Sequence, residues 1–225
     1  MKFIVFSFFL SSLAAFAQPQ ALNQLVYEIR NPETDAAHFR RALEKIGAIL
    51  AMDVLEELKK KEVAIQTLTG AEAKHFLVNE TPVLVTILRA GLPLHSGVQE
   101  VFPNAEVGFL AMSRNEETLK ADVDYVALPD LKGKTVILSD TMLATGGSLL
   151  DAIQMIEQKD PQRIFVIAAI ASKPGIERIA HYNPSVKIFA AAIDPSLNEK
   201  GYILPGLGDA GDRAYGKKHF GQQLP

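Results

Sequence analysis

The stretch from Thr135 to Gln154 constrains the fold of this chain more than any other feature. It begins with an apolar run, Val136–Leu138, which is followed by Asp140 and by a turn of small residues, Ala144–Ser148. Beyond the turn, apolar residues recur at helical spacing, at Leu149, Leu150, Ile153 and Ile156. This order predicts a buried strand, an acidic residue at its carboxyl end, a glycine turn and the start of a helix.

A helix start preceded by glycines is a favourable place for a phosphate. Unpaired backbone N–H groups and the helix dipole attract an anion there, and Gly146 and Gly147 allow a close approach of the backbone. Asp140 is placed to bind sugar hydroxyls or a hydrated cation. This stretch matches neither GxxxxGKS/T nor GxGxxG, however, and a Gly-Gly-Ser helix start is equally compatible with an ordinary capped turn.

Strand and helix patterns alternate along the chain, which predicts a single α/β domain with a parallel twisted sheet flanked by helices. We expect N-terminal helices at 23–30 and from Asp35 to about Lys60, with Lys59–Lys61 as the solvated end of the second. Apolar segments on either side of Thr69-Gly70 predict a β-hairpin arm. The expected sheet strands are 83–88, 106–111, 122–128, 135–139, 163–171 and 186–193, and the expected helices between them are 91–102, 149–158 and 175–181.

Charged residues stand at or just after the ends of several predicted strands. They are Arg89, Arg114, Asp140 and Asp194. Because ligands of open α/β sheets bind beyond the carboxyl ends of the strands, we expect these side chains to converge at one edge of the sheet. Without further support, Arg114 is better explained by a surface ion pair with Glu116 or Glu117.

Composition narrows the function classes. The net charge of −3 gives no indication of nucleic-acid binding, so any anion site must be local. The absence of cysteine excludes disulfides and thiolate metal sites. The five histidines lack the HxH and HExxH spacings of metal sites, and we interpret His95 as a helix residue rather than a ligand or base.

The N-terminus allows two interpretations. Residues 1–17 combine Lys2, an apolar run and a small-residue end at Ala15–Ala17, as in a secretory signal peptide. The alternative is an apolar arm that packs on the domain at 18–225. The segment is too short for a transmembrane helix, and we expect no membrane partner. We expect cytoplasmic function, which a mis-assigned start codon would reconcile with the signal-like segment.

Four segments resemble those of the uracil phosphoribosyltransferase family. Asp140–Ser148 resembles the phosphoribosyl diphosphate (PRPP) loop, Thr86–His95 its ILRAGL segment, Ser113–Lys120 its arginine loop and Gly201–Gly216 its uracil-binding tail. They occur in the family's order and at near-family spacing. By composition alone the last segment, rich in glycine, would be a loop.

Two positions depart from the family pattern. Thr141 stands where the family usually has proline, and Ser113 stands where its arginine loop usually begins with tyrosine. Threonine restores a backbone N–H donor that proline lacks. Neither change removes a charge, so the expected reaction is unaffected.

The resemblance implies a type I phosphoribosyltransferase fold and a glycosyltransferase reaction, in which uracil and PRPP give UMP and diphosphate. By resemblance, the catalytic residues are Asp140, Arg114 and Asp209. The implied PRPP-binding residues are Arg89, Arg114, Asp140, Thr141, Met142, Leu143, Ala144, Thr145, Gly146, Gly147, Ser148 and Asp209. The implied uracil-binding residues are Ile203, Gly208, Asp209 and Ala210.

The same resemblance implies Mg²⁺ as cofactor, held mainly through the substrate and its waters rather than by a protein metal cluster. It also implies a homodimer or larger oligomer, with GTP as an effector in some relatives. A non-catalytic nucleotide-binding regulator of the same fold is the alternative function. Tyr202 is expected to pack rather than to take part in catalysis.

Overall fold

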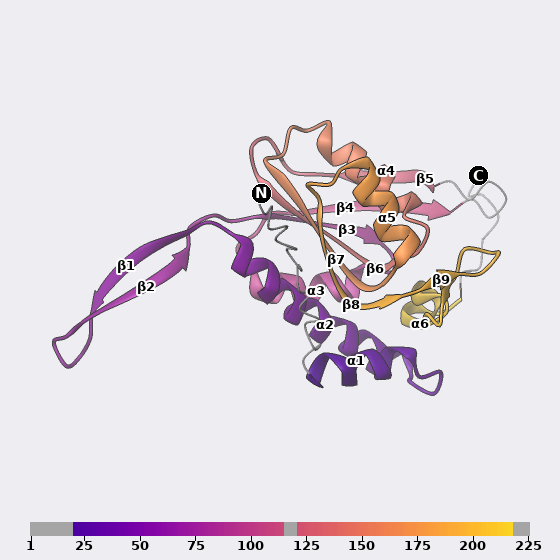
Figure 1. Cartoon of the computed structure of the whole chain (residues 1–225), viewed down its shortest axis with the longest axis horizontal. Coiled ribbons are helices and arrows are strands. Elements are labelled where there is room, and N and C mark those ends of the chain that lie inside the picture. The colour runs from indigo at the N-terminus through magenta and orange to yellow at the C-terminus, as the bar shows by residue number, and fades with distance from the viewer. Residues whose placement is uncertain (1–19, 115–120, 218–225) are drawn as a thin grey trace, which may run out of the picture.

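A six-stranded sheet forms the centre of the chain in the computed structural model, which describes residues 20–114 and 121–217. Its strands are Val83–Leu88 (β3), Val107–Arg114 (β4), Ala121–Ala127 (β5), Thr135–Leu143 (β6), Arg163–Ser172 (β7) and Lys187–Asp194 (β8). They follow the order β5-β4-β3-β6-β7-β8 (Figure 1), and neighbours are parallel except for β4 with β5. The prediction of a single α/β domain with a mostly parallel sheet is confirmed.

Helices cover both faces of the sheet, as predicted (Figure 1). One face packs against α1 (Gln20–Arg30), α2 (Ala36–Glu57) and α3 (Leu92–Val101), and the other against α4 (Gly147–Glu157) and α5 (Lys173–Tyr182). Alternate residues of each strand serve the two faces: in β6, Ile137 joins the first core, whereas Val136 and Leu138 join the second. A central strand buried on both faces has a continuous apolar run for this reason.

The N-terminal helices are held closely against the sheet. The Asp35 carboxylate caps α2 by accepting from the His38 N–H at 2.9 Å, as the sequence predicted. At the crossing of α2 and α3 the two backbones touch, since a Cβ added to Gly97 would lie 1.7 Å from the Glu44 carbonyl oxygen. Glycine is therefore required there, and the tight crossing fixes the position of α3 behind the ends of β3 and β6.

The predicted hairpin arm is present and projects away from the body of the molecule (Figure 1). It consists of β1 (Lys60–Gln66) and β2 (Glu72–Val78), which pair antiparallel. The expectation that Lys59–Lys61 ends a helix is wrong. Helix α2 ends at Glu57, and β1 begins at Lys60, because the Lys59 N–H donates to Glu80 and its carbonyl accepts from Asn79.

Two further differences from the sequence prediction lie near the carboxyl ends of the strands. Strand β6 does not stop at Ser139 but continues to Leu143, because its ladder with β7 continues to the pair Leu143–Ala171. The glycine-rich C-terminal segment is not all loop. It contains β10 (Ile203–Leu204), which pairs with β9 (Ser196–Leu197), and the short helix α6 (Ala210–Tyr215).

The N-terminal segment at 1–17, interpreted above as a signal peptide or an arm, lies outside the described residues. Within the part of the chain that the structure describes, no helix combines the length and the apolar character needed to cross a membrane.

Candidate active site

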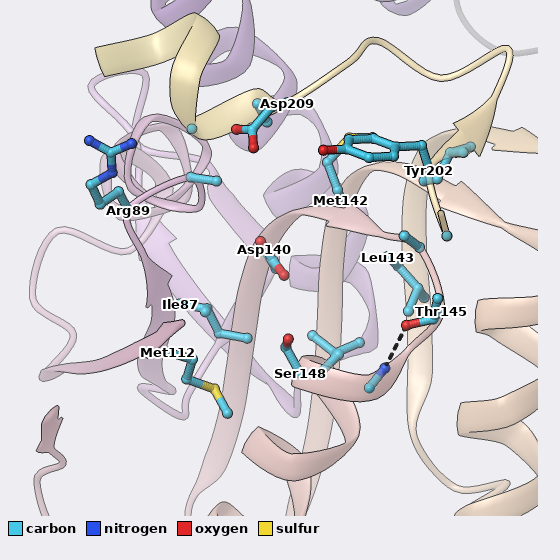
Figure 2. A pocket seen from close by; sticks show the side chains of 18 of the residues that line it. Ile87, Arg89, Met112, Asp140, Met142, Leu143, Thr145, Ser148, Tyr202 and Asp209 are labelled. Atoms are coloured by element: carbon cyan, nitrogen blue, oxygen red, sulfur yellow. Dashed lines mark hydrogen bonds between the residues drawn. The ribbon is translucent and has the colours of Figure 1, made fainter. Parts of the chain in front are cut away.

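A cleft of about 1130 Å³ opens beyond the carboxyl ends of β3 and β6. It brings together Arg89, Asp140, the loop Ala144–Ser148 and the C-terminal segment around Asp209 (Figure 2). Met142, Leu143, Ile203, Gly208 and Ala210 also line it. These residues come from distant parts of the sequence, and the sheet topology places them at one edge, where open α/β folds bind their ligands.

Asp140 lies where β6 separates from its neighbour. Strand β6 pairs with β3 up to Ser139, and beyond that point it pairs only with β7. The opening between the two strands leaves the Asp140 side chain directed into the cleft (Figure 2). Burial raises the pKa of this carboxyl from 3.8 to about 7, although the backbone N–H groups of Thr141 and Met142 favour its charged form. A cationic ligand in the cleft would restore the carboxylate.

The loop before α4 is built to accept an anion. Gly146 adopts a left-handed conformation, with φ 75°, and precedes the helix without a side-chain cap. Thr145 Oγ1 accepts from the Gly147 N–H at 3.4 Å, a long contact (Figure 2). A helix of this length starts with uncapped N–H groups and a positive dipole end, so the loop Thr145–Ser148 favours a phosphate.

Ser172 supports this loop from behind, and the sequence interpretation missed it. Its hydroxyl donates to the Ala144 carbonyl oxygen at 2.6 Å and accepts from the Gly175 N–H at 2.9 Å, capping α5. A Cβ at Gly175 would lie 2.4 Å from the same Ala144 oxygen. A serine at the end of a strand, followed by proline in the first turn of a helix, is the local signal that could have identified it.

Thr141 does not line the cleft, unlike its neighbours. Its side chain is buried, and its hydroxyl donates to the Ala90 carbonyl oxygen at 2.6 Å. Its backbone N–H instead stabilises the Asp140 carboxylate. The hydroxyl contact connects the segment after β3 to β6, and a proline could make neither interaction.

The charged residues at the rim differ in their surroundings. Arg89 lies at the edge of the cleft (Figure 2), and its Nη2 is 3.3 Å from the Asp212 carboxylate. Asp209 caps α6 by accepting from the Asp212 N–H at 2.8 Å. Arg114 is the last residue of β4, and its side chain lies outside the described part of the structure, as do residues 115–120 with Glu116 and Glu117.

Asp194 does not join the cleft, and the expectation that it converges there is wrong. It stands at the end of β8, but its carboxylate is buried and pairs with Arg30 at 2.7 Å. The position at a strand end predicted a side chain in the cleft, but the ion pair with Arg30 directs the Asp194 carboxylate into the core instead. His95 is a helix residue, as interpreted, and burial lowers its pKa to about 4, so that it is neutral at pH 7.

The described residues include no cluster of three or more histidine or acidic side chains that would form a metal site on its own. The cleft instead offers separate oxygen ligands, at Asp140 and Asp209, which suit a hard cation that keeps most of its waters. An anion loop, a carboxylate beside it and a glycine-rich segment opposite together fit a sugar phosphate with a flat ring attached.

Comparison with known proteins agrees with this geometry. Residues 16–217 match the family model described as uracil phosphoribosyltransferase. A uracil phosphoribosyltransferase of Aquifex aeolicus is 43% identical over 186 residues, covering 83% of this chain and 89% of its own length. One from Clostridium botulinum is 40% identical over 210 residues, covering 93% of this chain and all of its own. A solved structure of an Aquifex aeolicus protein superposes with a TM-score of 0.80 at 41% identity, covering 87% of this chain and 94% of that one.

Proposed function

Because this chain belongs to the uracil phosphoribosyltransferase family, we propose that it transfers the phosphoribosyl group of PRPP to uracil, yielding UMP and diphosphate. The chain is a pentosyltransferase of the type I fold. The observation that carries the proposal is the meeting of the anion loop, Asp140 and the C-terminal segment in one cleft. No contact in the described residues favours a regulator without activity.

In the reaction, the bond from the ribose C1′ to the diphosphate oxygen breaks, and its electron pair leaves with diphosphate. A bond forms between C1′ and N1 of uracil, and the N1 proton is lost. Charge builds up on the ribose as an oxocarbenium-like state, as in glycosyl transfer generally. Positioning of the two substrates and stabilisation of this charge then account for most of the rate.

For the donor, we assign the 5′-phosphate to Thr145, Gly146, Gly147 and Ser148, at the start of α4. Met142, Leu143 and Ala144 form the approach to this loop. Asp140 would hold the ribose hydroxyls and, as a carboxylate, stabilise the developing positive charge. Thr141 contributes from outside the lining, through its N–H to Asp140.

For the leaving group, we assign Arg89 and Arg114, because guanidinium groups bind phosphate oxygens through two parallel hydrogen bonds. Arg89 must exchange its 3.3 Å contact with Asp212 for the diphosphate. An exposed ion pair of this length stabilises the protein by no more than about 1 kcal/mol, so breaking it to bind diphosphate costs little free energy.

Magnesium enters the proposal as an ion carried by the donor. Asp140 and Asp209 supply the carboxylate oxygens that Mg²⁺ prefers, and the cleft leaves room for the waters that it keeps. When bound, the ion neutralises charge on the diphosphate. The raised pKa of Asp140 agrees with a site that is completed by a cation.

For the acceptor, we propose that backbone groups of Ile203, Gly208 and Ala210 bind the edge of uracil, with Asp209 between the base and the donor. Uracil presents carbonyl acceptors and imide N–H donors, which fixed backbone groups can match. Cytosine places an amino group where uracil has a carbonyl, and each buried mismatch costs about 1–3 kcal/mol.

We also propose that the protein is a homodimer or larger and that the hairpin arm takes part in assembly. Residues Val63, Ile65, Ala73 and Leu77 share one face of the arm, by the register of β1 and β2. Ile65 and Leu77 are exposed in the single chain, and burial against a second copy would remove them from water. Salvage of uracil in the cytoplasm, with GTP as effector, follows from the same resemblance and remains part of the proposal.

The proposed function is tested by incubating the purified protein with uracil, PRPP and Mg²⁺ and measuring UMP and diphosphate. We expect both products in equal amounts, and a much lower rate of nucleotide formation when cytosine replaces uracil. Binding of PRPP without formation of UMP would instead identify a regulator.

A further inference from the structure

Arg30 and Asp194 hold the backbone of the C-terminal segment at Gly206. The Arg30 guanidinium donates to both Asp194 carboxylate oxygens, at 2.7 and 2.9 Å, and to the Gly206 carbonyl oxygen at 2.8 Å. The same carboxylate accepts from the Gly206 N–H at 2.9 Å. These four hydrogen bonds form a closed clamp, in which the N–H and the carbonyl of Gly206 are both bound.

We propose that Arg30 and Asp194 are positioning residues that fix the uracil-binding segment, Ile203–Gly208, and thereby set selectivity for the base. The inference rests on the proposed function, because it takes this segment to bind the edge of uracil. Neither residue lines the cleft, so both act through Gly206. Selectivity would then depend on side chains that never contact the base.

The position of Gly206 is transmitted directly to Ile203. Gly206 is buried, with φ 59°, and a Cβ added to it would lie 2.2 Å from the Ile203 carbonyl oxygen. The chain thus folds back on itself between two residues that line the cleft, Ile203 and Gly208. Because the two backbones lie this close, we expect a shift of Gly206 to move the Ile203 backbone as well.

A second arginine, Arg213 of α6, connects the next residue, Leu207, to the same end of α1. Arg213 donates to the Leu207 carbonyl oxygen at 3.1 Å and to the Asn31 carbonyl oxygen at 2.7 Å, and it also contacts the Ile29 carbonyl. Its guanidinium lies over the Phe39 ring, 4.3 Å from the centroid. The carbonyls of Gly206 and Leu207 therefore both accept from guanidinium groups, and the segment is attached to the C-terminal end of α1 as well as to β8, through Asp194.

The clamp has little tolerance for substitution. The Asp194 side chain is 6% exposed and that of Arg30 is 23% exposed, so removing one partner leaves a charge with poor access to water. Lysine retains the charge of Arg30 but cannot bind both carboxylate oxygens and the Gly206 carbonyl at once, because it lacks the planar fork. Asparagine at position 194 would direct an N–H group toward either the guanidinium or the Gly206 N–H.

A rigid segment matters for the base and not for the donor. Discrimination between uracil and cytosine depends on backbone donors and acceptors that cannot turn to suit the wrong base. The phosphate loop is held separately, by Ser172 at Ala144. Loosening Gly206 should therefore weaken the binding of uracil and leave that of PRPP unchanged.

The test compares Asp194→Asn and Arg30→Lys with a matched control, Glu80→Gln. Glu80 also pairs with an arginine, Arg163, across distant parts of the chain, and the two side chains are 17% and 29% exposed. Neither residue lines the cleft. The Glu80 variant therefore reports the cost of breaking a similar ion pair away from the uracil-binding segment.

For wild type and the three variants we would measure KM for uracil, KM for PRPP, the ratio of kcat/KM for uracil to that for cytosine, and Tm. In Asp194→Asn and Arg30→Lys we expect the uracil KM to rise roughly tenfold, since small displacements at a reacting centre are costly. The PRPP KM should stay within about twofold, and the preference for uracil should fall. Glu80→Gln should lower Tm while leaving the other three quantities unchanged.

The inference is overturned if a folded Arg30→Lys or Asp194→Asn variant keeps the uracil KM and base preference of the wild type. It is also overturned if both KM values rise together, or if Glu80→Gln reproduces the change. If Asp194→Asn does not fold, the more conservative Arg30→Lys decides. Absence of UMP with the wild-type protein would refute the proposed function itself, which is a separate result.

Discussion

The Thr141 hydroxyl donates a 2.6 Å hydrogen bond to the carbonyl oxygen of Ala90. This contact joins β6, one residue after Asp140, to the segment that follows β3, one residue after Arg89. The segments that carry the residues assigned to the ribose and to the diphosphate of the donor are therefore connected through one buried hydroxyl. A proline at this position could not form the contact.

Replacing Thr141 with valine should weaken both stability and donor binding. The Ala90 carbonyl would lose its donor, and an unsatisfied buried acceptor costs about 1–3 kcal/mol. We expect the unfolding free energy in urea to fall by that amount and the PRPP KM to rise. Thr135→Val is the control at the other end of β6, where the threonine oxygen accepts from Arg163. It should lower stability only, and an equal change in the PRPP KM would contradict the role of Thr141.

The raised pKa of Asp140 predicts a pH dependence of stability. The folded protein holds the Asp140 proton more tightly than the unfolded chain, whose carboxyl titrates near 3.8. The resulting stabilisation is complete below that pH and is lost as pH rises toward about 7. Asp140→Asn stays neutral, so its Tm minus that of the wild type should increase between pH 4 and pH 8. A difference that does not change with pH would show that Asp140 titrates normally.

Ser172→Ala should affect PRPP binding although the residue lies behind the phosphate loop. It removes the donor to Ala144 and the cap of α5, whose loss costs about 1 kcal/mol. Asp35→Ala removes a comparable cap from α2, remote from the cleft. We expect similar decreases in Tm for both variants but a higher PRPP KM only for Ser172→Ala. Equal PRPP KM values in the two variants would argue against support of the loop by Ser172.

Asp140→Ala should reduce turnover far more than Tyr202→Phe. Asp140 is assigned to the ribose, whereas Tyr202 lines the cleft with its ring and is partly exposed. We expect kcat to fall by roughly 10²-fold or more in the first variant, the usual effect of losing a group that stabilises developing charge. The second should change kcat little. Similar losses in both would require these two roles to be reassigned.

The arm should be needed for assembly. Replacing Ile65 and Leu77 with lysine places two charges on one face of the hairpin, where burial would cost several kcal/mol. Sedimentation velocity should show a smaller species than the wild type. The control, Lys74→Glu with Glu62→Lys, reverses an existing ion pair on the opposite face and should leave the mass unchanged. An unaltered mass in the first variant would exclude this face of the arm from the interface.

The sheet was predictable because its strands are buried on both faces. Val83–Leu88 is apolar at nearly every position, and a run of that kind has few other structures available. The end of β6 was not predictable in the same way, because the polar pair Asp140-Thr141 interrupts the apolar run while the ladder with β7 continues. The sequence pattern shows where polar residues begin, whereas the length of a strand also depends on how far the neighbouring strand continues to pair with it.

The long-range contacts were beyond the reach of local pattern. Asp194 was correctly placed at a strand end, but its partner Arg30 lies 164 positions away. Helix α6 was hidden by glycines, and its stability comes from burial of Ala210 and Ala214 and from Arg213 stacked on Phe39. Motif resemblance located the cleft residues, but it could not indicate which of them, like Thr141, turn away from it.

The contact between Arg30 and Gly206 also has a consequence for synthesis on the ribosome. The two residues are 176 positions apart. At a translation rate of about 5–20 residues per second, Gly206 is therefore synthesised roughly 10–35 s after Arg30. During that interval the nascent chain can already form the central strands and the phosphate loop. The residues assigned to the base are thus among the last parts of the cleft to be translated, and a chain that ended before Gly206 would lack both the clamp and Asp209, the carboxylate assigned between the base and the donor.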